Sequence, residues 1–462
     1  MISETITTDN SVNQQLVRET LGNLTRQQMI ELVQQNGIVG AGGAGFPTYV
    51  KLDSNIEILL VNAAECEPLL KVDQQLIEYY AAEMIRGLLY GMAMTNAKKG
   101  IIAIKEKYAL AINALEPLLP HNIDIFLLPD IYPAGDEVIT IWLATGRQVA
   151  AGALPSSVGV LVNNVQTLIS VSRALEKQSP VTHRTLTVNG AVASPITFEA
   201  PIGITLREAL ALAGGPTIEH PAFIVGGPMM GKVIDDLSQP ITKTTGGLLV
   251  LPHDHILIRR QNTSLSSILN MARNVCEQCK MCTELCPRHL IGHELSPSEI
   301  VKAVCYQNVS QPSILTSALT CSECGVCEAY ACPVDISPMR VNRELKKQYR
   351  EKGIRYSGEL RPVDPIINHR FVPIKRLVTR LGLERFNHAA PFKRLDWYPS
   401  KVTIPLQQHI GAPAVPISKV GDLVSEGQCI AAPAPDALSV AIHSSITGTV
   451  ESVSATHITV RR

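Results

Sequence analysis

The chain has 462 residues, enough for about three domains of ordinary size. Its hydrophobic share of 45% and charged share of 18% suit several packed cores and exclude an intrinsically disordered chain. Lys and Arg number 41, as do Asp and Glu, and this balance argues against a protein devoted to nucleic acid or to an anionic membrane surface. No apolar run approaches the roughly 18 residues that a membrane-spanning helix needs. The polar start MISETITTDNSVNQQ lacks the pattern of a secretory signal, so we expect a cytoplasmic protein.

Residues 1–35 are polar and Gln/Asn-rich. They carry apolar side chains at loosely helical spacing, at Val12, Leu16, Val17, Leu21 and Leu24. The pattern predicts a helical extension that packs on the first domain. A targeting or docking helix, whose apolar face lies in a partner's groove, is the alternative.

Residues 36–180 alternate strand-like apolar runs with helix-like stretches. Buried strands are expected at 56–64, 100–104, 123–129 and 158–165, and helices at 73–94 and 105–118. This alternation is typical of an α/β domain with a mostly parallel sheet.

The texture of the chain then changes three times. Residues 181–260 combine strand-like runs with a helix-like stretch at 206–215 and predict a small α+β domain. Residues 261–345 have a helical pattern around cysteine motifs, and the basic, Pro-punctuated residues 346–402 predict a linker that wraps other domains. Residues 403–462 alternate short strand-like runs with Gly turns, which favours a small all-β sandwich or barrel.

Nine of the 11 cysteines lie between Cys276 and Cys332. Dense, regularly spaced cysteines in a chain without a signal sequence indicate metal binding before disulfides. The first motif is Cys276-x2-Cys279-x2-Cys282-x3-Cys286-Pro287, and the second is Cys321-x2-Cys324-x2-Cys327-x4-Cys332-Pro333. Three thiolates at this spacing wrap one face of a cubane cluster, and in two-cluster ferredoxins the Cys before the Pro ligates the other cluster. We therefore predict one [4Fe–4S] cluster on Cys276, Cys279, Cys282 and Cys332, and a second on Cys321, Cys324, Cys327 and Cys286.

A pair of zinc sites is the alternative, because zinc sites also use C-x2-C pairs. Zinc normally takes two well-separated pairs, whereas here three cysteines repeat at x2 and a Cys-Pro closes each run, so iron–sulfur is favoured. The x4 spacing before Cys332 departs from the common x3. The remaining cysteines, Cys66, Cys305 and Cys429, are expected to be small buried side chains.

Basic residues accompany both motifs. Arg288 and His289 follow the first Cys-Pro, and His293 is near; we expect solvated helix residues, with tuning of a cluster or proton shuttling as the alternative. After the second motif comes a basic run of Arg340, Arg343, Lys346, Lys347, Arg350, Lys352 and Arg355. This run is expected to form an exposed helix face, and docking of an acidic partner is the alternative.

A glycine-rich loop precedes the first expected strand, with five glycines between Gly37 and Gly45. Such a loop lets the backbone approach a ligand and point its N–H groups at phosphate. It is neither a Walker A motif nor a GxGxxG after a strand, so a structural turn is the alternative. Three polar segments follow it: Asn62-Ala-Ala-Glu65-Cys66-Glu67-Pro68, Tyr132-Pro-Ala-Gly135-Asp136-Glu137 and Asn163-Asn164-Val165-Gln166-Thr167.

These four segments, in this order, resemble the flavin-binding domain shared by the NADH-oxidising subunit of respiratory complex I and the C subunit of the Rnf electron-transport complex. The resemblance implies a Rossmann-like domain that binds FMN non-covalently, with NADH as the electron donor. The residues that it implies around the flavin and the dinucleotide are Gly40, Gly42, Gly43, Gly45, Lys51, Asn62, Glu65, Tyr132, Gly135, Asp136, Glu137, Asn163, Asn164 and Thr167.

The resemblance covers nearly the whole chain. Residues 181–252, with TVNGAVASP and GGPMMG, resemble a soluble-ligand-binding β-grasp (SLBB) module. Residues 403–462 resemble a barrel-sandwich hybrid domain, but AAPAPDALSVA contains no Lys and so excludes a swinging-arm carrier. This domain order, with the two cysteine motifs, resembles the cobalamin reductases of propanediol-utilisation bacterial microcompartments. The implied fold is multidomain, α/β plus α+β: a Rossmann-like FMN domain, a β-grasp domain, a helical two-cluster ferredoxin domain and a C-terminal barrel-sandwich β domain.

That resemblance implies an oxidoreductase that takes electrons from NADH through FMN and two [4Fe–4S] clusters and reduces cob(III)alamin through cob(II)alamin toward cob(I)alamin. It also implies an adenosyltransferase that converts the product to coenzyme B12, shell proteins as further partners, and a location in the microcompartment. Two other roles stay open. One is an Rnf-like electron-transfer subunit whose acceptor is another protein, and the other is a shell component whose clusters conduct electrons across the shell.

Overall fold

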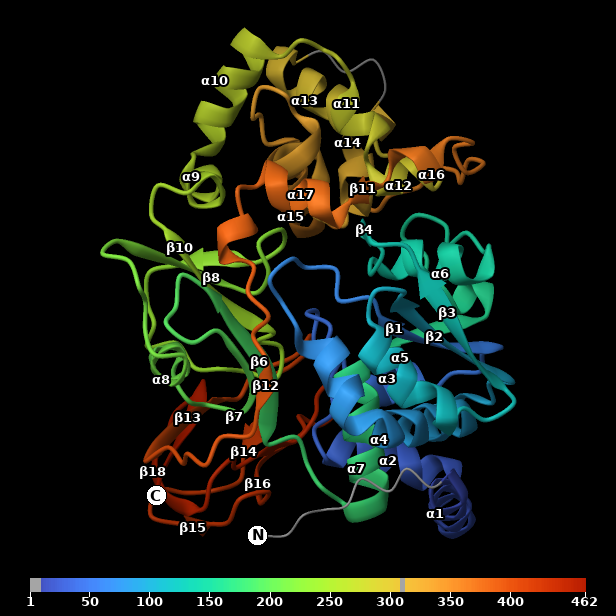
Figure 1. Cartoon of the computed structure of the whole chain (residues 1–462), viewed down its shortest axis with the longest axis vertical. Helices are drawn as coiled ribbons and strands as arrows, with labels where there is room; N and C mark the ends of the chain where they lie inside the picture. The colour runs from blue at the N-terminus through green and yellow to red at the C-terminus, as the bar shows by residue number, and fades with distance from the viewer. Residues whose placement is uncertain (1–9, 308–311) are drawn as a thin grey trace.

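The computed structural model describes residues 10–307 and 312–462, so part of the expected N-terminal extension lies outside the described residues. Four parts pack together (Figure 1): an α/β part in blue and cyan, a mixed sheet in green, a helical part in yellow and orange, and a C-terminal β part in red. Among the described residues, no helix is both long and apolar enough to cross a membrane. The expected multidomain fold is confirmed.

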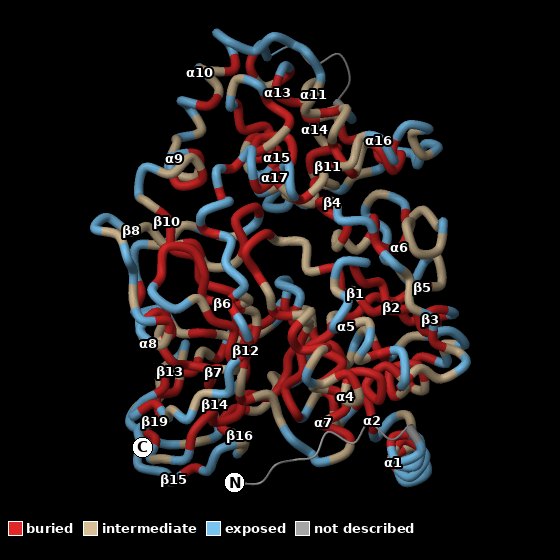
Figure 2. Tube along the Cα trace, viewed as in Figure 1, coloured by how far each residue is buried: buried red, intermediate tan, exposed pale blue. Residues whose placement is uncertain are grey.

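The N-terminal region forms two helices rather than one, α1 (Asn10–Asn23) and α2 (Arg26–Gln35). Thr25 starts α2 with a capping box, in which its hydroxyl accepts from the backbone of Gln28 and its backbone donates to the Gln28 side chain. Val17 of α1 is buried in the core of the α/β part, whereas most of the helix surface is exposed (Figure 2).

The α/β part is built on a four-stranded parallel sheet in the order β3-β2-β1-β5. Its strands are β1 (Ile58–Ala63), β2 (Lys99–Lys105), β3 (Ile123–Leu128) and β5 (Val160–Asn164). The helices are α3 (Thr48–Leu52), α4 (Val72–Thr95), α5 (Ala109–Leu115), α6 (Glu137–Thr145) and α7 (Val165–Lys177). α4 and α7 cover one face and α6 the other. Since a Cβ at Gly87 would lie 1.9 Å from the carbonyl oxygen of Leu168, only glycine permits the close packing of α4 on α7.

The connections of this sheet reverse direction at the carboxyl ends of β1 and β5, and we call this place the crevice. The chain leaves β1 toward β2 and β3 on one side and returns to β5 on the other. In open α/β sheets, ligands bind outside the carboxyl ends of the strands where the order reverses in this way. That point lies between β1 and β5, whose register pairs Asn62 with Asn164.

The mixed sheet has six strands in the order β12-β7-β6-β10-β8-β9. Its elements are β6 (His183–Gly190), β7 (Ile196–Pro201), α8 (Leu206–Leu212), β8 (Pro221–Val225), β9 (Lys232–Ile234), β10 (Gly247–Pro252) and β12 (Phe392–Lys393). Its core is continuous with that of the C-terminal β part. That part contains β13 (Lys401–Pro405), β14 (Val415–Pro416), β15 (Leu423–Val424), β16 (Cys429–Ala432), β17 (Ile442–His443), β18 (Gly448–Val453) and β19 (His457–Arg461).

Short helices surround the cysteine motifs. They are α9 (Ile256–Asn262), α10 (Leu265–Val275), α11 (Met281–Glu284), α12 (Pro287–Leu290), α13 (Pro297–Tyr306), α14 (Pro312–Thr316), a π-helical turn (Cys327–Ala331) and α15 (Pro338–Glu351).

The segment after the second motif has structure of its own. It finishes α15 and then forms α16 (Ile367–Arg370), β11 (Val372–Pro373) and α17 (Ile374–Arg380). β11 pairs antiparallel with β4 (Ile131–Tyr132), and β12 pairs parallel with β7. β11 and β4 form a separate two-stranded sheet, while β12 adds an edge strand to the mixed sheet, so the segment connects the helical part to the α/β part and to the mixed sheet.

Candidate functional site

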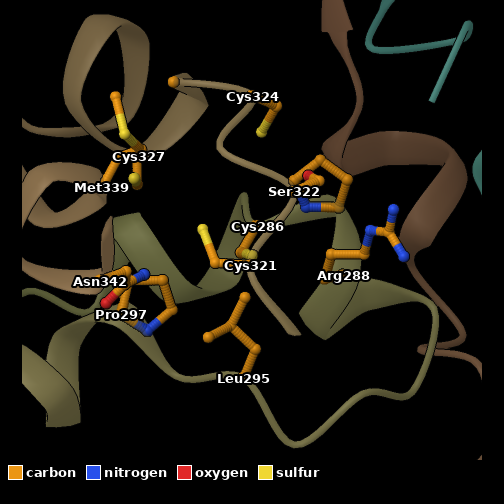
Figure 3. Close-up of a pocket in the computed structure, with 12 residues that line it drawn as sticks. Cys286, Arg288, Leu295, Pro297, Cys321, Ser322, Cys324, Cys327, Met339 and Asn342 are labelled. Carbon is orange, nitrogen blue, oxygen red and sulfur yellow. The ribbon is translucent and has the colours of Figure 1, made fainter. Parts of the chain in front are cut away.

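Four of the motif cysteines, Cys286, Cys321, Cys324 and Cys327, line one cavity, which we call the inner cavity (Figure 3). Cys286, Cys321 and Cys327 are buried and Cys324 is partly buried. Burial, with the Cys321 thiol close by, raises the pKa of Cys286 to about 12. A metal that coordinates such thiols deprotonates them outright.

The other four motif cysteines line a second and wider cavity, which we call the outer cavity: Cys276, Cys279, Cys282 and Cys332. Cys305, which lies outside the motifs, also lines it. Cys276 and Cys279 are exposed to solvent, whereas Cys332 is buried. Burial and the neighbouring thiols, Cys332 first, raise the pKa of Cys282 to about 12. The extra residue before Cys332 therefore leaves its side chain among the cysteines of the first motif.

The two cysteine loops share one backbone design. In each, the second and fourth residues after the first Cys have positive φ: Gln278 (50°) and Lys280 (62°), and Glu323 (60°) and Gly325 (75°). These left-handed turns aim successive thiols toward the same side. Backbone N–H groups then approach two thiols, Glu323 N–H to Cys321 Sγ at 3.4 Å and Ile336 N–H to Cys332 Sγ at 3.3 Å.

The cysteine sets are not arranged around a single point. Within residues 10–307 and 312–462, no group of three or more His, Cys, Asp or Glu side chains is close enough to hold one metal ion. A tetrahedral zinc site with Zn–S bonds of about 2.3 Å needs such a group. Thiols that instead surround a cavity fit a cubane cluster, whose four irons each take one cysteine.

The glycine-rich loop lies beside the crevice between β1 and β5. Gly42, Gly43 and Ala44 form an exposed turn, and the N–H of Ala41 donates to Oγ1 of Thr167, 2.9 Å away in α7. Gly43 has φ of 118°, and a Cβ built there meets nothing within 4 Å. The loop thus presents open backbone to the crevice.

Two buried polar atoms at the crevice lack a hydrogen-bond partner among the described residues. They are Oγ1 of Thr48, which follows the glycine-rich loop, and Nδ2 of Asn163, near the end of β5. Buried polar groups in native proteins are normally paired, so these atoms suit contacts to a polar ligand. Together with the open loop they fit a flavin mononucleotide.

Several of the expected flavin residues contact one another in the same region. Lys51 Nζ lies 3.2 Å from Oε1 of Glu137 and from the carbonyl oxygen of Val162. Asn62 Nδ2 donates to the carbonyl oxygen of Gly135 at 2.8 Å. Gly40 N–H donates to the carbonyl oxygen of Phe46, and Gly45 is packed against Thr244.

A buried carboxyl pair lies beside this group. Glu65 Oε2 accepts from the backbone N–H of Asp73 at 2.5 Å, and Asn164 Nδ2 donates to Asp73 Oδ2 at 2.9 Å. Burial, with Asp73 close by, raises the pKa of Glu65 to about 8, and burial raises that of Asp73 to about 6. At neutral pH the pair therefore retains at least one proton.

The crevice and the inner cavity are joined by two polar contacts. The Tyr132 hydroxyl donates to the carbonyl oxygen of Cys324 at 2.7 Å. Arg288, which follows Cys286-Pro287, donates from Nη2 to Oδ2 of Asp136 at 2.8 Å. Asp136 Oδ1 accepts from the first N–H groups of α6, so this carboxylate is fully engaged between the two parts.

Family models match four parts of the chain. A model described as the Nuo51 FMN-binding domain matches residues 33–173, and an SLBB domain matches residues 185–233. A 4Fe–4S dicluster domain matches residues 275–337, and an RnfC barrel-sandwich hybrid domain matches residues 387–461. The FMN-binding and iron–sulfur character of the two sites is thereby supported independently of their geometry.

Relatives with similar sequences cover the full length. The cobalamin reductase PduS of Salmonella typhimurium (strain LT2) is 57% identical over 439 residues, which are 95% of this chain and 97% of that protein. The cobalamin reductase PduS of Citrobacter freundii is 57% identical over 436 residues, 94% and 97% of the two chains. The chain belongs to the cobalamin reductase PduS family. It is therefore an oxidoreductase, and the expected resemblance is confirmed.

A more distant relative shares a smaller part. It is the C subunit of the proton-translocating ferredoxin:NAD(+) oxidoreductase complex of Clostridium ljungdahlii. That protein is 33% identical over 279 residues, which are 59% of this chain and 58% of its own length.

In this PduS-family chain two expectations about basic residues are wrong. The Arg288 side chain is only 16% exposed and is paired with Asp136 rather than solvated. His293 is buried, and its Nε2 lies 2.9 Å from the carbonyl oxygen of Val149. His289 is partly buried against the carbonyl oxygen of Leu295. Arg288 and His293 therefore belong to the contact between the helical and α/β parts, whereas His289 bonds within the helical part.

The basic run is partly engaged. Lys346 donates to the carbonyl oxygen of Cys321 at 2.7 Å and, with Arg343, pairs with Glu323. Arg340 donates to the carbonyl oxygen of Arg260 at 2.9 Å. The run beyond these residues is exposed: Lys347, Arg350, Lys352 and Arg355.

Of the three cysteines outside the motifs, Cys305 is buried, while Cys66 and Cys429 are only partly buried. Cys66 Sγ accepts from the N–H of Gly135 at 2.6 Å, within the group of expected flavin residues.

Sequence patterns alone missed three residues at these sites. Thr48 closely follows the glycine-rich loop, and this position in the sequence could have identified it as a candidate ligand contact. Ser322 and Asn342 line the inner cavity. Ser322 stands between two motif cysteines, but Asn342 lies ten residues beyond Cys332 and no motif includes it.

Proposed function

We propose that this chain passes electrons from NADH, through FMN and two [4Fe–4S] clusters, to cobalamin, and so reduces cob(III)alamin toward cob(I)alamin. The observation that carries the proposal is the direct contact between the crevice and the inner cavity, through Tyr132 with Cys324 and Asp136 with Arg288. Membership of the PduS family supports the acceptor, and the relative from a ferredoxin:NAD(+) oxidoreductase complex supports the donor.

The residues that would hold FMN are those of the crevice: Gly40, Gly42, Gly43, Gly45, Lys51, Asn62, Glu65, Tyr132, Gly135, Asp136, Glu137, Asn163, Asn164 and Thr167. Thr48 joins them because its buried hydroxyl has no partner among the described residues. The inner cavity would hold one cluster on Cys286, Cys321, Cys324 and Cys327, and the outer cavity the other on Cys276, Cys279, Cys282 and Cys332. A flavin exchanges electrons in pairs or singly, and an iron–sulfur cluster carries them one at a time.

The positions of the two cavities support a direction of electron transfer from the crevice through the inner cavity to the outer cavity. Tyr132 and Asp136 hold the cysteine loops of the inner cavity against the crevice, and this contact supports a position for the cavity on the donor side. Cys276 and Cys279 of the outer cavity face solvent, where an acceptor can approach. Glu65 and Asp73 keep a proton in the crevice at neutral pH. The acceptor is therefore expected to meet the chain at the outer cavity.

The same proposal includes the wider setting implied by the resemblance. An adenosyltransferase would take the reduced cobalamin, and the location would be the propanediol-utilisation microcompartment, with shell proteins as further partners. The support is the family membership of the chain.

The test is a series of anaerobic visible spectra of the purified protein, taken before and after NADH and again after cob(III)alamin. We expect NADH to bleach the flavin and cluster bands, and cob(III)alamin then to restore them while the cob(II)alamin band rises. A protein that NADH bleaches but cobalamin does not reoxidise would overturn the acceptor and favour another protein, as for an Rnf-like subunit or a shell-associated conduit. A protein that NADH leaves unchanged would overturn the donor.

A further inference from the structure

The inner cavity is lined by polar side chains whose hydrogen-bonding groups lack partners. Arg288 Nε, Ser322 Oγ, and both Nδ2 and Oδ1 of Asn342 are buried and unpaired within the part of the chain that the structure describes. No residue around the outer cavity has such an atom in the same described ranges. Each cavity has four motif cysteines, but the two differ in this polar lining.

Asn342 is the clearest case. Its side chain is 0% exposed, and it lies on α15 one turn after Met339, which lines the same cavity (Figure 3). Lys346, one turn further along, donates to the carbonyl oxygen of Cys321. This face of α15 is therefore turned toward the inner cysteine loops. Since an unpaired amide in a protein interior is costly and rare, the group that fills the cavity is its natural partner.

We propose that the Asn342 amide donates a hydrogen bond to a sulfur of the inner cluster and raises the reduction potential of that cluster. The inference rests on the proposed function only for the presence of a cluster in the inner cavity. Adding an electron makes a cluster more negative, and N–H groups directed at its sulfurs stabilise that charge. Ser322 would act in the same direction through its hydroxyl.

The polar lining of the inner cavity can stabilise the negative charge that reduction adds to a buried cluster. Burial disfavours additional negative charge, because no water is present to solvate it. The outer cavity is open at Cys276 and Cys279, where solvent can supply that stabilisation. Cys286, Cys321 and Cys327 of the inner cavity are buried, so polar side chains of the chain itself take the place of water beside them.

The test is a redox titration of the cluster-loaded full-length protein, followed by electron paramagnetic resonance with dithionite as the reductant. Asn342→Leu keeps the approximate volume but removes the amide. We expect one of the two cluster signals to shift to a more negative midpoint potential and the other to stay, with the iron content unchanged. Asn262→Leu, at an exposed position at the end of α9, is the matched control and should shift neither signal.

Unchanged potentials in an Asn342→Leu protein that retains its iron would overturn the proposal, as would equal shifts of both signals. If that variant loses iron, a measurement on the wild-type protein still tests the hydrogen bond. Pulsed resonance should detect a coupled ¹⁴N nucleus that disappears when only asparagine side chains carry ¹⁵N, and its absence would also overturn the proposal. Because dithionite replaces NADH and no cobalamin is present, failure of the donor or the acceptor would not affect these measurements.

Discussion

The inner and outer cavities are made from the same cysteine spacing and the same left-handed turns, yet their surroundings differ in every other respect. Three of the four motif cysteines of the inner cavity are buried. This cavity contacts the crevice through Tyr132 and Asp136 and has unpaired polar side chains around it. The outer cavity is open to solvent at Cys276 and Cys279. The cysteine motif thus determines which group is bound. The neighbouring elements determine whether that group lies near the flavin crevice or near solvent.

The largest effect is expected when one cysteine is removed from each cavity in turn. Cys324→Ala and Cys279→Ala should each lose about half of the bound iron, because each disables one of two cubane sites. With NADH, the Cys279→Ala protein should still reduce its remaining cluster, whereas the Cys324→Ala protein should reduce its flavin alone. Iron analysis and anaerobic spectra measure both effects, and a reversed pattern would exchange the donor and acceptor sides.

The donor side depends on the glycine-rich loop, and Gly43→Val should abolish FMN binding. A branched side chain is strained at a φ of 118° and would project into the open space where the backbone meets phosphate. Gly421→Val is the matched control, since Gly421 has φ of 93° and also meets nothing within 4 Å, but lies in the C-terminal β part. Normal flavin content in purified Gly43→Val protein would refute this placement of the phosphate.

The contact between the crevice and the inner cavity can be weakened without removing a cysteine or the Tyr132 ring. Tyr132→Phe removes the hydrogen bond to the Cys324 carbonyl, which should cost about 1 kcal/mol of folding stability. Electron transfer from NADH-reduced flavin to the clusters should slow, while flavin and iron contents stay normal. Stopped-flow spectra measure the rate, and Tyr398→Phe, at an exposed ring, should leave it unchanged.

A smaller effect is expected on the pH dependence of folding stability, and it arises from Glu67, which packs near the inner cysteine loop. Glu67 accepts from the N–H groups of Met229 and Met230, and the Met229 carbonyl oxygen lies 3.2 Å from a Cβ built on Gly325 in the inner cysteine loop. Burial raises the pKa of Glu67 to about 7 in the folded chain, against an ordinary value of 4.5. The protonated carboxyl is thus the form that the fold favours. Its stabilising contribution is complete below pH 4.5 and is lost as the pH rises through about 7.

Melting curves of the wild type and of Glu67→Gln between about pH 5 and 8 test this effect. The wild-type melting temperature should fall more steeply with rising pH than that of the variant. Glu359→Gln, at an exposed position, should follow the wild type. Equal slopes for wild type and Glu67→Gln would contradict the prediction.

Local patterns predicted much of this molecule. The strands β1, β2, β3 and β5 follow from runs of apolar residues, and the cysteine sets of the two cavities correspond to the ligand sets expected from spacing. The surroundings of the cavities were not predictable in this way. Arg288 was expected in solvent because its partner, Asp136, is 152 positions away along the chain. Asn342 carries no motif, and its significance comes only from the face of α15 on which it lies.

The pairing of β11 with β4 and of β12 with β7 affects the order in which the parts of the protein can fold during synthesis. The strand β4 and the mixed sheet receive these partners from residues synthesised after the second cysteine motif. On the ribosome, β4 and the β7 edge of the mixed sheet therefore emerge unpaired, and they are covered only when residues 372–393 have been made. All eight motif cysteines precede these residues in the chain, so they are synthesised before either edge is covered.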